Sequence, residues 1–289
     1  MKKSLCALAL LIAVSIFAGD AAPAYPIQTD IVYGRTSGVE LKLDLAVPKE
    51  GEGPFPLLVF IHGGGWAGGN KASYHGAIRG WAQKGYVCAT VEYRFAPAHR
   101  FPAQVEDVKC AVRYLRSRAR ELKIDKDKVA AIGDSAGGHL SLMLGLMDKD
   151  DGLEGNCGCC ADESSKVQAV INYYGPTDFT VKHEIAKNPV VMTLVSNFLG
   201  TNDQTAPVFK QASPVTYINK GDPPVLTFQG TKDPLVPDEQ ARHLHAELKK
   251  AGVVEKLEII EGGGHGFSGE VRLKTVQMTE EFLKTHFKK

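Results

Sequence analysis

The chain has 289 residues, of which 44% are hydrophobic and 23% are charged. This composition is that of an ordinary globular protein, and it excludes collagen-like, coiled-coil and disordered chains. Lys and Arg number 34 against 33 Asp and Glu, which gives a formal net charge of +1. Nucleic-acid-binding proteins usually carry a clear basic excess, so no nucleic-acid partner is expected.

The first 22 residues have the features of a secretory signal peptide. Lys2 and Lys3 precede an apolar run over residues 5–17, and small residues follow it up to Ala22. The run is shorter than the ~20 residues that a membrane-spanning helix needs. We therefore expect cleavage after residues 1–22, a single domain over residues 23–289, and a secreted or periplasmic protein without stable membrane insertion. An uncleaved N-terminal anchor is the alternative.

The strand patterns begin after a Pro-containing connection at residues 24–29. Leu41, Leu43, Leu45 and Val47 alternate with less apolar residues, as in an antiparallel strand near the edge of a sheet. Further along the chain, short apolar runs with little alternation are typical of strands that are buried on both faces. These runs are residues 57–61, 86–91, 129–132, 167–173, 225–228 and 257–260.

Helical patterns separate these strands, at residues 105–115, 136–147, 239–251 and 270–287. The segment 136–147 is apolar on nearly all sides and is therefore expected to be buried. Alternating strands and helices predict a three-layer α/β sandwich with a mostly parallel sheet and antiparallel strands at its N-terminal edge. Residues 174–223 are the least regular part of the chain, and they are our candidate for a small lid over a site.

A G-x-S-x-G motif, Gly133-Asp134-Ser135-Ala136-Gly137, lies between a predicted buried strand and a predicted helix. This is the context of a nucleophile elbow, in which a sharp turn exposes the serine. Glycine is needed on both sides, because a Cβ there would collide with the neighbouring strand or helix. The turn places Ser135 at a helix N-terminus, where the helix dipole favours a developing negative charge. A glycine turn without a catalytic role is the alternative.

The segment His62-Gly63-Gly64-Gly65-Trp66 directly follows the apolar run at residues 57–61. Consecutive glycines tolerate positive φ angles, so their N–H groups can turn toward an oxyanion. We assign Gly63 and Gly64 as oxyanion donors together with Ala136, the residue after the predicted nucleophile. Trp66 is assigned to substrate binding, as part of an aromatic wall that Tyr74 and Trp81 could extend. Trp81 is expected to belong to a helix core instead.

The predicted nucleophile needs a general base and an acid to orient the base. In this type of fold the chain order is serine, acid, histidine, which favours Asp233 and His265. Both residues follow predicted strands, at the sheet edge where ligands bind in open α/β sheets.

Other residues of the same types compete for these two roles. The rival acids are Asp222, Asp238 and Glu261. His139 is expected to be a hydrogen-bonded core residue and His62 to brace its own loop, whereas His243 and His245 are expected to be solvated on a helix.

The elbow motif, the glycine loop and the segment around His265 are accompanied by two further motifs, Tyr93-Arg94-Phe95-Ala96-Pro97 and Asn172-Tyr173-Tyr174-Gly175-Pro176-Thr177-Asp178. Together these motifs resemble those of α/β-hydrolase fold esterases. The chain is similar to the hormone-sensitive-lipase-like group, and more so to secreted bacterial carbohydrate esterases such as acetylxylan and feruloyl esterases. The resemblance covers nearly all of residues 31–287. It implies a serine hydrolase with the triad Ser135, Asp233 and His265, acting through an acyl-enzyme.

The resemblance further implies a small-molecule or carbohydrate ester substrate with a short acyl or aryl group, and it implies neither a cofactor nor a metal ion. An amidase or peptidase of the same fold, either arylformamidase-like or prolyl-oligopeptidase-like, is one alternative. A lipase acting on longer acyl chains is another, and a non-catalytic binding module is a third.

The segment Asn156-Cys157-Gly158-Cys159-Cys160 departs from the polar loop that such esterases usually carry at this position. Its cysteines are expected to form a local or loop-to-loop disulfide, with a soft-metal site and unpaired thiols as alternatives. Cys88 and Cys110 fall in a predicted strand and a predicted helix, so both are expected to be small core residues.

Overall fold

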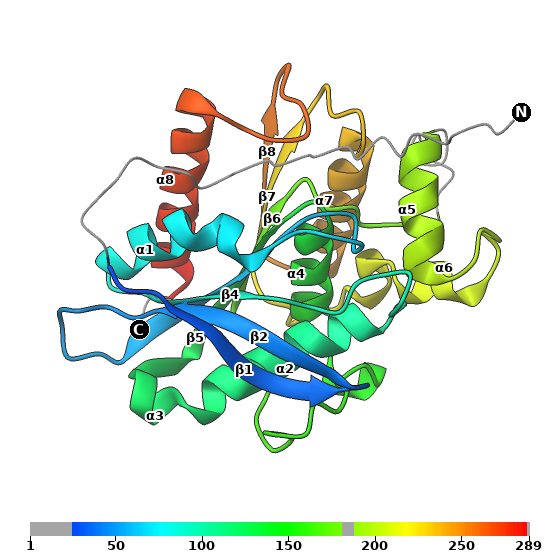
Figure 1. The fold of residues 1–289 in the computed structure, drawn as a ribbon. Helices are drawn as coiled ribbons and strands as arrows, with labels where there is room; N and C mark the ends of the chain where they lie inside the picture. The colour runs from blue at the N-terminus through cyan, green and yellow to red at the C-terminus, as the bar shows by residue number, and fades with distance from the viewer. Residues whose placement is uncertain (1–24, 181–187, 288–289) are drawn as a thin grey trace, which may run out of the picture.

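The computed structural model describes residues 25–180 and 188–287, so the predicted signal peptide lies outside the described residues. Within the described part, one eight-stranded sheet has the order β1-β2-β4-β3-β5-β6-β7-β8 (Figure 1). The strands are β1 (Gln28–Thr36), β2 (Val39–Ala46), β3 (Phe55–Ile61), β4 (Val87–Val91), β5 (Ile124–Asp134), β6 (Ala169–Tyr173), β7 (Val225–Gly230) and β8 (Glu255–Ile260).

The sheet confirms the predicted mixture of strand directions. β2 pairs antiparallel with both β1 and β4, and all the later neighbours pair in parallel. The sequence had not indicated β1, because register shifts interrupt its pairing with β2 and break the period-two pattern. β8 is partly exposed rather than buried on both faces, since it forms the far edge of the sheet.

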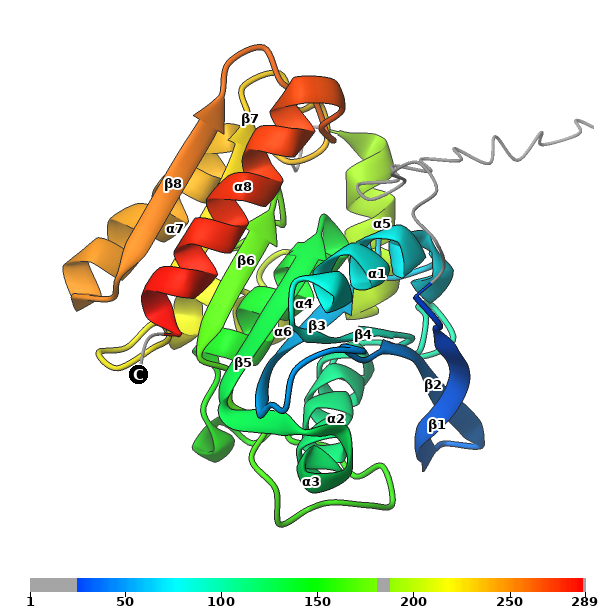
Figure 2. The same cartoon turned by 90° about the vertical axis from the view of Figure 1, so that its left-hand side faces the viewer.

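Helices cover both faces of the sheet. They are α1 (His75–Gln83), α2 (Ala103–Ser117), α3 (Ala119–Leu122), α4 (Ala136–Leu146), α5 (Pro189–Leu199), α6 (Pro207–Gln211), α7 (Asp238–Ala251) and α8 (Gly269–His286), with short 3-10 helices η1 (Lys71–Tyr74), η2 (Lys149–Asp151) and η4 (Pro214–Tyr217). α1 and α8 lie on one face, with α4 and α7 behind the sheet (Figure 2). This arrangement is the predicted three-layer sandwich.

Alternate residues of β3 show how the strands divide the core between the two faces. Leu58 and Phe60 belong to the apolar cluster that contains Ile78 of α1 and Phe282 of α8. Leu57, Val59 and Ile61 belong to the cluster of α2, α4 and α7. A central strand buried on both faces therefore carries an unbroken apolar run, as the sequence pattern indicated.

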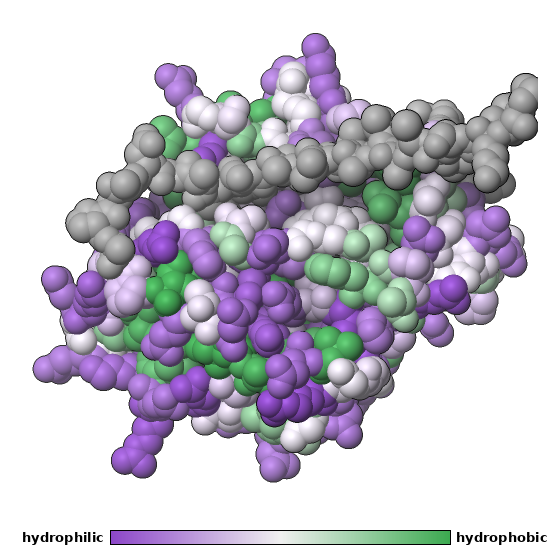
Figure 3. Space-filling model, viewed as in Figure 1, coloured by the Kyte–Doolittle hydropathy of each residue, from purple (hydrophilic) through white to green (hydrophobic). Residues whose placement is uncertain are grey.

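The surface in the view of Figure 1 is mostly polar, and apolar side chains show between polar ones over β1, β2 and α2 (Figure 3). Scattered apolar side chains of this kind are normal on a protein surface. In the described part of the chain, no helix combines the length and the apolar character that crossing a bilayer demands.

A disulfide joins Cys110 of α2 to Cys157, with a Cα–Cα distance of 6.3 Å. A disulfide at the Cys157 loop agrees with the expectation, but the prediction that Cys110 is only a core residue was wrong. The loop reaches α2 because Glu154 accepts hydrogen bonds from Lys109 and Arg113. Among the described residues Cys88, Cys159 and Cys160 are free, and Cys88 is fully buried as expected.

Substituting Gly137 by alanine is expected to destabilise the fold by about 3 kcal/mol or more, because a Cβ there would lie 2.0 Å from the Ile61 carbonyl oxygen. The control is Gly80→Ala in α1, where a Cβ meets no atom within 4 Å. Alanine at position 80 should raise the free energy of unfolding by about 0.5–1 kcal/mol. Urea unfolding of the two variants measures both effects. Equal stabilities would contradict the packing argument.

Candidate active site

Ser135 sits at the sharp turn between β5 and α4, as the G-x-S-x-G motif predicted. Its backbone has φ of 52°, in the left-handed region that non-glycine residues rarely adopt. The Ser135 N–H donates to the Tyr173 carbonyl oxygen at 2.8 Å, which ties the turn to the end of β6. Strain of this kind is stored at functional sites when the surrounding structure enforces it.

The structure brings Ser135, His265 and Asp233 into one hydrogen-bonded line. His265 Nε2 lies 2.9 Å from Ser135 Oγ, and His265 Nδ1 lies 2.7 Å from Asp233 Oδ2. The other carboxylate oxygen of Asp233 accepts hydrogen bonds from the N–H groups of Leu235 and Val236 at 2.8 and 2.9 Å. The carboxylate is therefore fixed and has no exposed surface.

The rival acids lie elsewhere. Asp238 pairs with Arg242 one turn further along α7, at 2.7 Å, and Glu261 accepts a hydrogen bond from Thr231. The Asn219 N–H donates to Asp222. Asp233 is the acid that contacts the imidazole.

The loops that carry the acid and the histidine follow adjacent strands and are locked together. The Lys232 N–H donates to the Gly263 carbonyl oxygen at 2.8 Å, and the Thr231 N–H donates to the Ile260 carbonyl oxygen at 3.1 Å. A Cβ on Gly230 would lie 2.3 Å from the Gly263 carbonyl oxygen. Asp233 and His265 therefore have a fixed relative position before any substrate binds.

The oxyanion loop differs from the prediction at Gly63. The Gly63 N–H donates to Asp134 Oδ1 at 3.2 Å, so this N–H group is already engaged and the assignment of Gly63 was wrong. Among the described residues, the N–H groups of Gly64 and Gly65 have no hydrogen-bond acceptor. The N–H of Ala136 belongs to the first turn of α4, where backbone donors lack partners within the helix.

Asp134 is a site residue to which the sequence analysis assigned no role, although it is the second residue of the G-x-S-x-G motif. Its buried carboxylate accepts hydrogen bonds from the Gly63 N–H and the Tyr74 hydroxyl. Burial raises the pKa of Asp134, and the hydrogen bond from Tyr74 acts in the opposite direction. Asp134 thus connects the oxyanion loop directly to the nucleophile turn.

The prediction that Trp66 binds substrate was wrong for the described conformation. Its side chain is only 4% exposed, because it stacks on Phe198 of α5 with ring centroids 4.3 Å apart. Its Nε1–H donates to His139 Nδ1 at 3.2 Å. Tyr74 and Trp81 are buried as well, so these rings form no open aromatic wall.

His139 is the buried, hydrogen-bonded residue that the sequence indicated. Its Nε2 lies 2.7 Å from the Ala212 carbonyl oxygen. Burial lowers the pKa of His139 to about 4, so the ring is neutral near pH 7. A neutral ring can donate from Nε2 and still accept the Trp66 hydrogen bond at Nδ1.

His62 braces its loop, as expected. Its Nδ1 lies 2.7 Å from the Gly63 carbonyl oxygen, and its ring stacks on Tyr93 at 4.6 Å. The Tyr93 hydroxyl donates to the His62 carbonyl oxygen at 2.9 Å. Burial lowers the pKa of His62 to about 4, so this histidine also stays neutral near pH 7.

The two histidines of α7 do not share one environment. His243 is partly exposed, in agreement with the expectation, and lies 3.3 Å from Asp178. His245 is 5% exposed, and its Nδ1 lies 2.6 Å from Glu255 of β8, so the prediction of a solvated His245 was wrong. The reason is that the adjacent strand supplies a partner that helical spacing does not reveal.

Tyr174 is a second residue of the site that sequence reasoning had not assigned. Its ring lies 4.7 Å from the His265 ring, and its backbone has φ of 42°. Among the described residues its buried hydroxyl has no hydrogen-bond partner. Its position directly after β6, at the same sheet edge as Ser135, was the available signal.

The segment at residues 174–223 contributes α5 to the surroundings of the site. A Cβ on Gly65 would lie 2.8 Å from Leu194 of α5. Asn188, at the start of α5, donates from Nδ2 to the Pro234 carbonyl oxygen at 3.0 Å. α5 therefore contacts both the oxyanion loop and the loop of Asp233.

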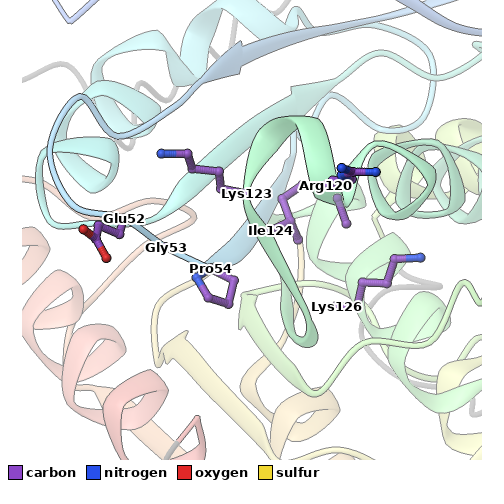
Figure 4. A pocket seen from close by; sticks show the side chains of 8 residues that line it. Glu52, Gly53, Pro54, Arg120, Lys123, Ile124 and Lys126 are labelled. Carbon is purple, nitrogen blue, oxygen red and sulfur yellow. The ribbon is translucent and has the colours of Figure 1, made fainter.

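Figure 4 shows a pocket of about 400 Å³ whose lining includes none of the triad residues. Glu52, Lys123 and Ile124 line it, near the first residues of β3 and β5. Ser135 follows the last residue of β5, so the pocket and the serine lie at opposite edges of the parallel sheet. The pocket is therefore not part of the site.

The mixed sheet, the serine at a strand–turn–helix elbow, and the acid and histidine after later strands define an α/β-hydrolase. The model of the BD-FAE family matches residues 43–248, which is well over half of the chain. The chain belongs to the BD-FAE family of α/β-hydrolase esterases.

Solved structures of esterases share this fold. A truncated carbohydrate esterase from gut microbiota aligns with a TM-score of 0.80 and 26% identity, over 92% of this chain and all of that one. The esterase Est2 of Thermogutta terrifontis, solved with butyrate bound, aligns with a TM-score of 0.75 and 30% identity, over 91% of this chain and 94% of that one. These neighbours agree with the resemblance to carbohydrate esterases.

Curated relatives from Mycobacterium tuberculosis are also esterases. Esterase LipC is 34% identical over 74% of this chain and 53% of its own length. The probable carboxylic ester hydrolase LipM is 32% identical over 75% of this chain and 50% of its own length. The chain spans about half the length of the curated relatives it matches.

Proposed function

We propose that the protein is a carboxylic ester hydrolase that works through a Ser-His-Asp triad. The observation that carries the proposal is the line from Ser135 Oγ through His265 to Asp233, with distances of 2.9 and 2.7 Å. Such a line is the arrangement that activates a serine toward an acyl carbon. The esterases among its relatives support the same reaction class.

In this mechanism His265 Nε2 accepts the Ser135 proton as Oγ attacks the ester carbonyl. Asp233 keeps the proton of His265 on Nδ1 and stabilises the imidazolium that forms. The N–H groups of Gly64, Gly65 and Ala136 stabilise the oxyanion, and each such donor contributes about 2.7–4 kcal/mol in comparable sites. The alcohol then leaves, and water deacylates Ser135 through the same base.

We propose short acyl or aryl esters, including esters on carbohydrate, as the substrate class. Two observations support this choice: Leu194 of α5 lies against Gly65 of the oxyanion loop, and Trp66 beside it is buried. Both leave little room for a long acyl chain along this side of the loop. Structural neighbours include carbohydrate esterases and an esterase solved with propionate and with butyrate.

A rate series on p-nitrophenyl esters from acetate to palmitate tests this proposal, with acetylated xylan and methyl ferulate measured beside it. We expect kcat/KM to be highest for acyl chains of two to four carbons and to fall steeply beyond them. A maximum at palmitate would identify a lipase instead. Faster turnover of a formyl-anilide than of any ester would identify an amidase. The Ser135→Ala variant supplies the background rate for every substrate.

We further propose that the protein is exported and is secreted or periplasmic. The signal-like residues 1–22 support it, as does the Cys110–Cys157 disulfide, because disulfides persist mainly in oxidising compartments. Fractionation of producing cells, with immunodetection of the protein, tests this location.

A further inference from the structure

A third sulfur lies beside the Cys110–Cys157 disulfide. The Sγ atoms of Cys110, Cys157 and Cys159 all lie within 4.8 Å of one another. Cys159 is a free, half-buried thiol, and its Sγ lies 3.4 Å from the Tyr33 carbonyl oxygen of β1. Cys110 Sγ lies 4.0 Å from the same carbonyl. Strand β1 thus holds the free thiol next to the bonded pair.

The charges around the three sulfurs are not balanced. Arg113 Nη2 lies 4.0 Å from Cys157 Sγ. Arg113 and Lys109 are both buried and both pair with one carboxylate, Glu154, at 2.7 and 2.8 Å. Two cations against one anion leave positive charge beside Cys157, which stabilises a thiolate at that sulfur.

We propose that Cys159 is a thiol–disulfide exchange site that takes over the bond to Cys110. The Cys159 thiolate attacks Cys110 Sγ, the Cys110–Cys157 bond breaks, and Cys157 leaves as a thiolate beside Arg113. The proton lost by Cys159 passes to solvent, and Cys157 regains one. One disulfide and one thiol are present before and after, so the step needs neither an oxidant nor a reductant.

Attack on Cys110, rather than on Cys157, follows from the position of the guanidinium. The better leaving group in exchange is the sulfur whose thiolate is more stable. Cys110 and Cys157 are both buried in the same apolar cluster, and it is Cys157 that Arg113 lies against. The exchange therefore keeps the loop attached to α2 and moves its point of attachment two residues along the chain.

The rate of this exchange should depend on pH through Cys159. Burial and the neighbouring Cys160 raise the pKa of Cys159 to about 11, and Arg113 acts in the opposite direction. Only the thiolate attacks, so the exchange is slow at pH 7 and accelerates up to tenfold per pH unit toward pH 9. Glu154, which pairs with Arg113 and Lys109, is a charged neighbour on the loop side.

The test follows the disulfide itself and is independent of esterase activity. The full chain is incubated without reductant at pH 7, 8 and 9, quenched with acid, and its free thiols are blocked with N-ethylmaleimide. Mass spectrometry of unreduced peptides, with fragmentation at Gly158, then distinguishes a link from Cys110 to Cys157 from a link to Cys159. We expect the Cys110–Cys159 link and label on Cys157 to increase with time and with pH.

Two serine variants and an internal marker complete the experiment. Cys159→Ser should lower the labelling of Cys157 at least tenfold. Cys160→Ser should not lower it, since Cys160 Sγ lies 3.3 Å from Ser117 Oγ, outside the three-sulfur cluster, and the Cys160 thiol only disfavours the Cys159 thiolate. Wild-type protein that keeps only the Cys110–Cys157 link at every pH would overturn the proposal. Exchange confined to molecules that are also labelled on the fully buried Cys88 would overturn it too, because it would require unfolding.

Discussion

Replacing Ser135 by alanine is expected to lower kcat for p-nitrophenyl acetate by about 10⁶-fold, the loss seen when a triad serine is removed from a comparable hydrolase. Without Oγ, no acyl-enzyme forms and His265 has no nucleophile to deprotonate. The residual rate comes from the oxyanion donors and from substrate binding. Steady-state rates measured against a no-enzyme background give the effect directly.

The matched control is Ser141→Ala. Ser141 is buried on α4, and its Oγ donates to the Gly137 carbonyl oxygen rather than contacting the imidazole. We expect this variant to keep kcat within a few-fold of the wild type. Undiminished turnover by Ser135→Ala would reject the triad, and an equal loss in both variants would show that disruption of α4, not loss of the nucleophile, is responsible.

The second large effect is expected for Asp233→Asn, with a decrease in kcat of about 10⁴-fold and little change in KM. An amide that donates to Nδ1 forces the proton of His265 onto Nε2, so the ring can no longer accept the serine proton. The fold should be retained, because the asparagine side chain can still accept from the Leu235 and Val236 N–H groups. Circular dichroism checks the fold and initial rates give kcat.

Asp238→Asn provides the comparison. Asp238, the rival acid, lies five residues further along the chain and pairs with Arg242. Its replacement by asparagine is expected to leave kcat unchanged. If Asp238→Asn were the slower variant, the acid would have been assigned wrongly. A purely structural role for Asp233 predicts a lowered melting temperature together with the lost rate, which the unfolding transition of Asp233→Asn would reveal.

Local patterns were sufficient for much of this fold. The buried strands and α4 are mostly apolar, which is a property of each segment that needs no knowledge of its neighbours. Ser135, Asp233 and His265 could be predicted together because each follows a recognisable strand and the parallel strands end at one edge of the sheet.

The residues that were predicted wrongly depend on partners far away in the chain. Gly63 is engaged by Asp134, 71 residues later, and Trp66 by Phe198 of α5. Cys110 pairs with Cys157 across 47 residues. No periodicity or local motif encodes such a partner. β1 was missed for a different reason, because its register shifts remove the alternation that marks a strand.

The buried Asp134 has a consequence for how this scaffold can be adapted. Because one carboxylate joins the oxyanion loop to the residue before the nucleophile, the donors and the serine form a single rigid unit. Changes within that unit alter every substrate alike. We therefore expect selectivity between acyl groups to change through side chains that face this unit, such as Leu194 of α5, which makes α5 the first helix to diversify in an engineered library.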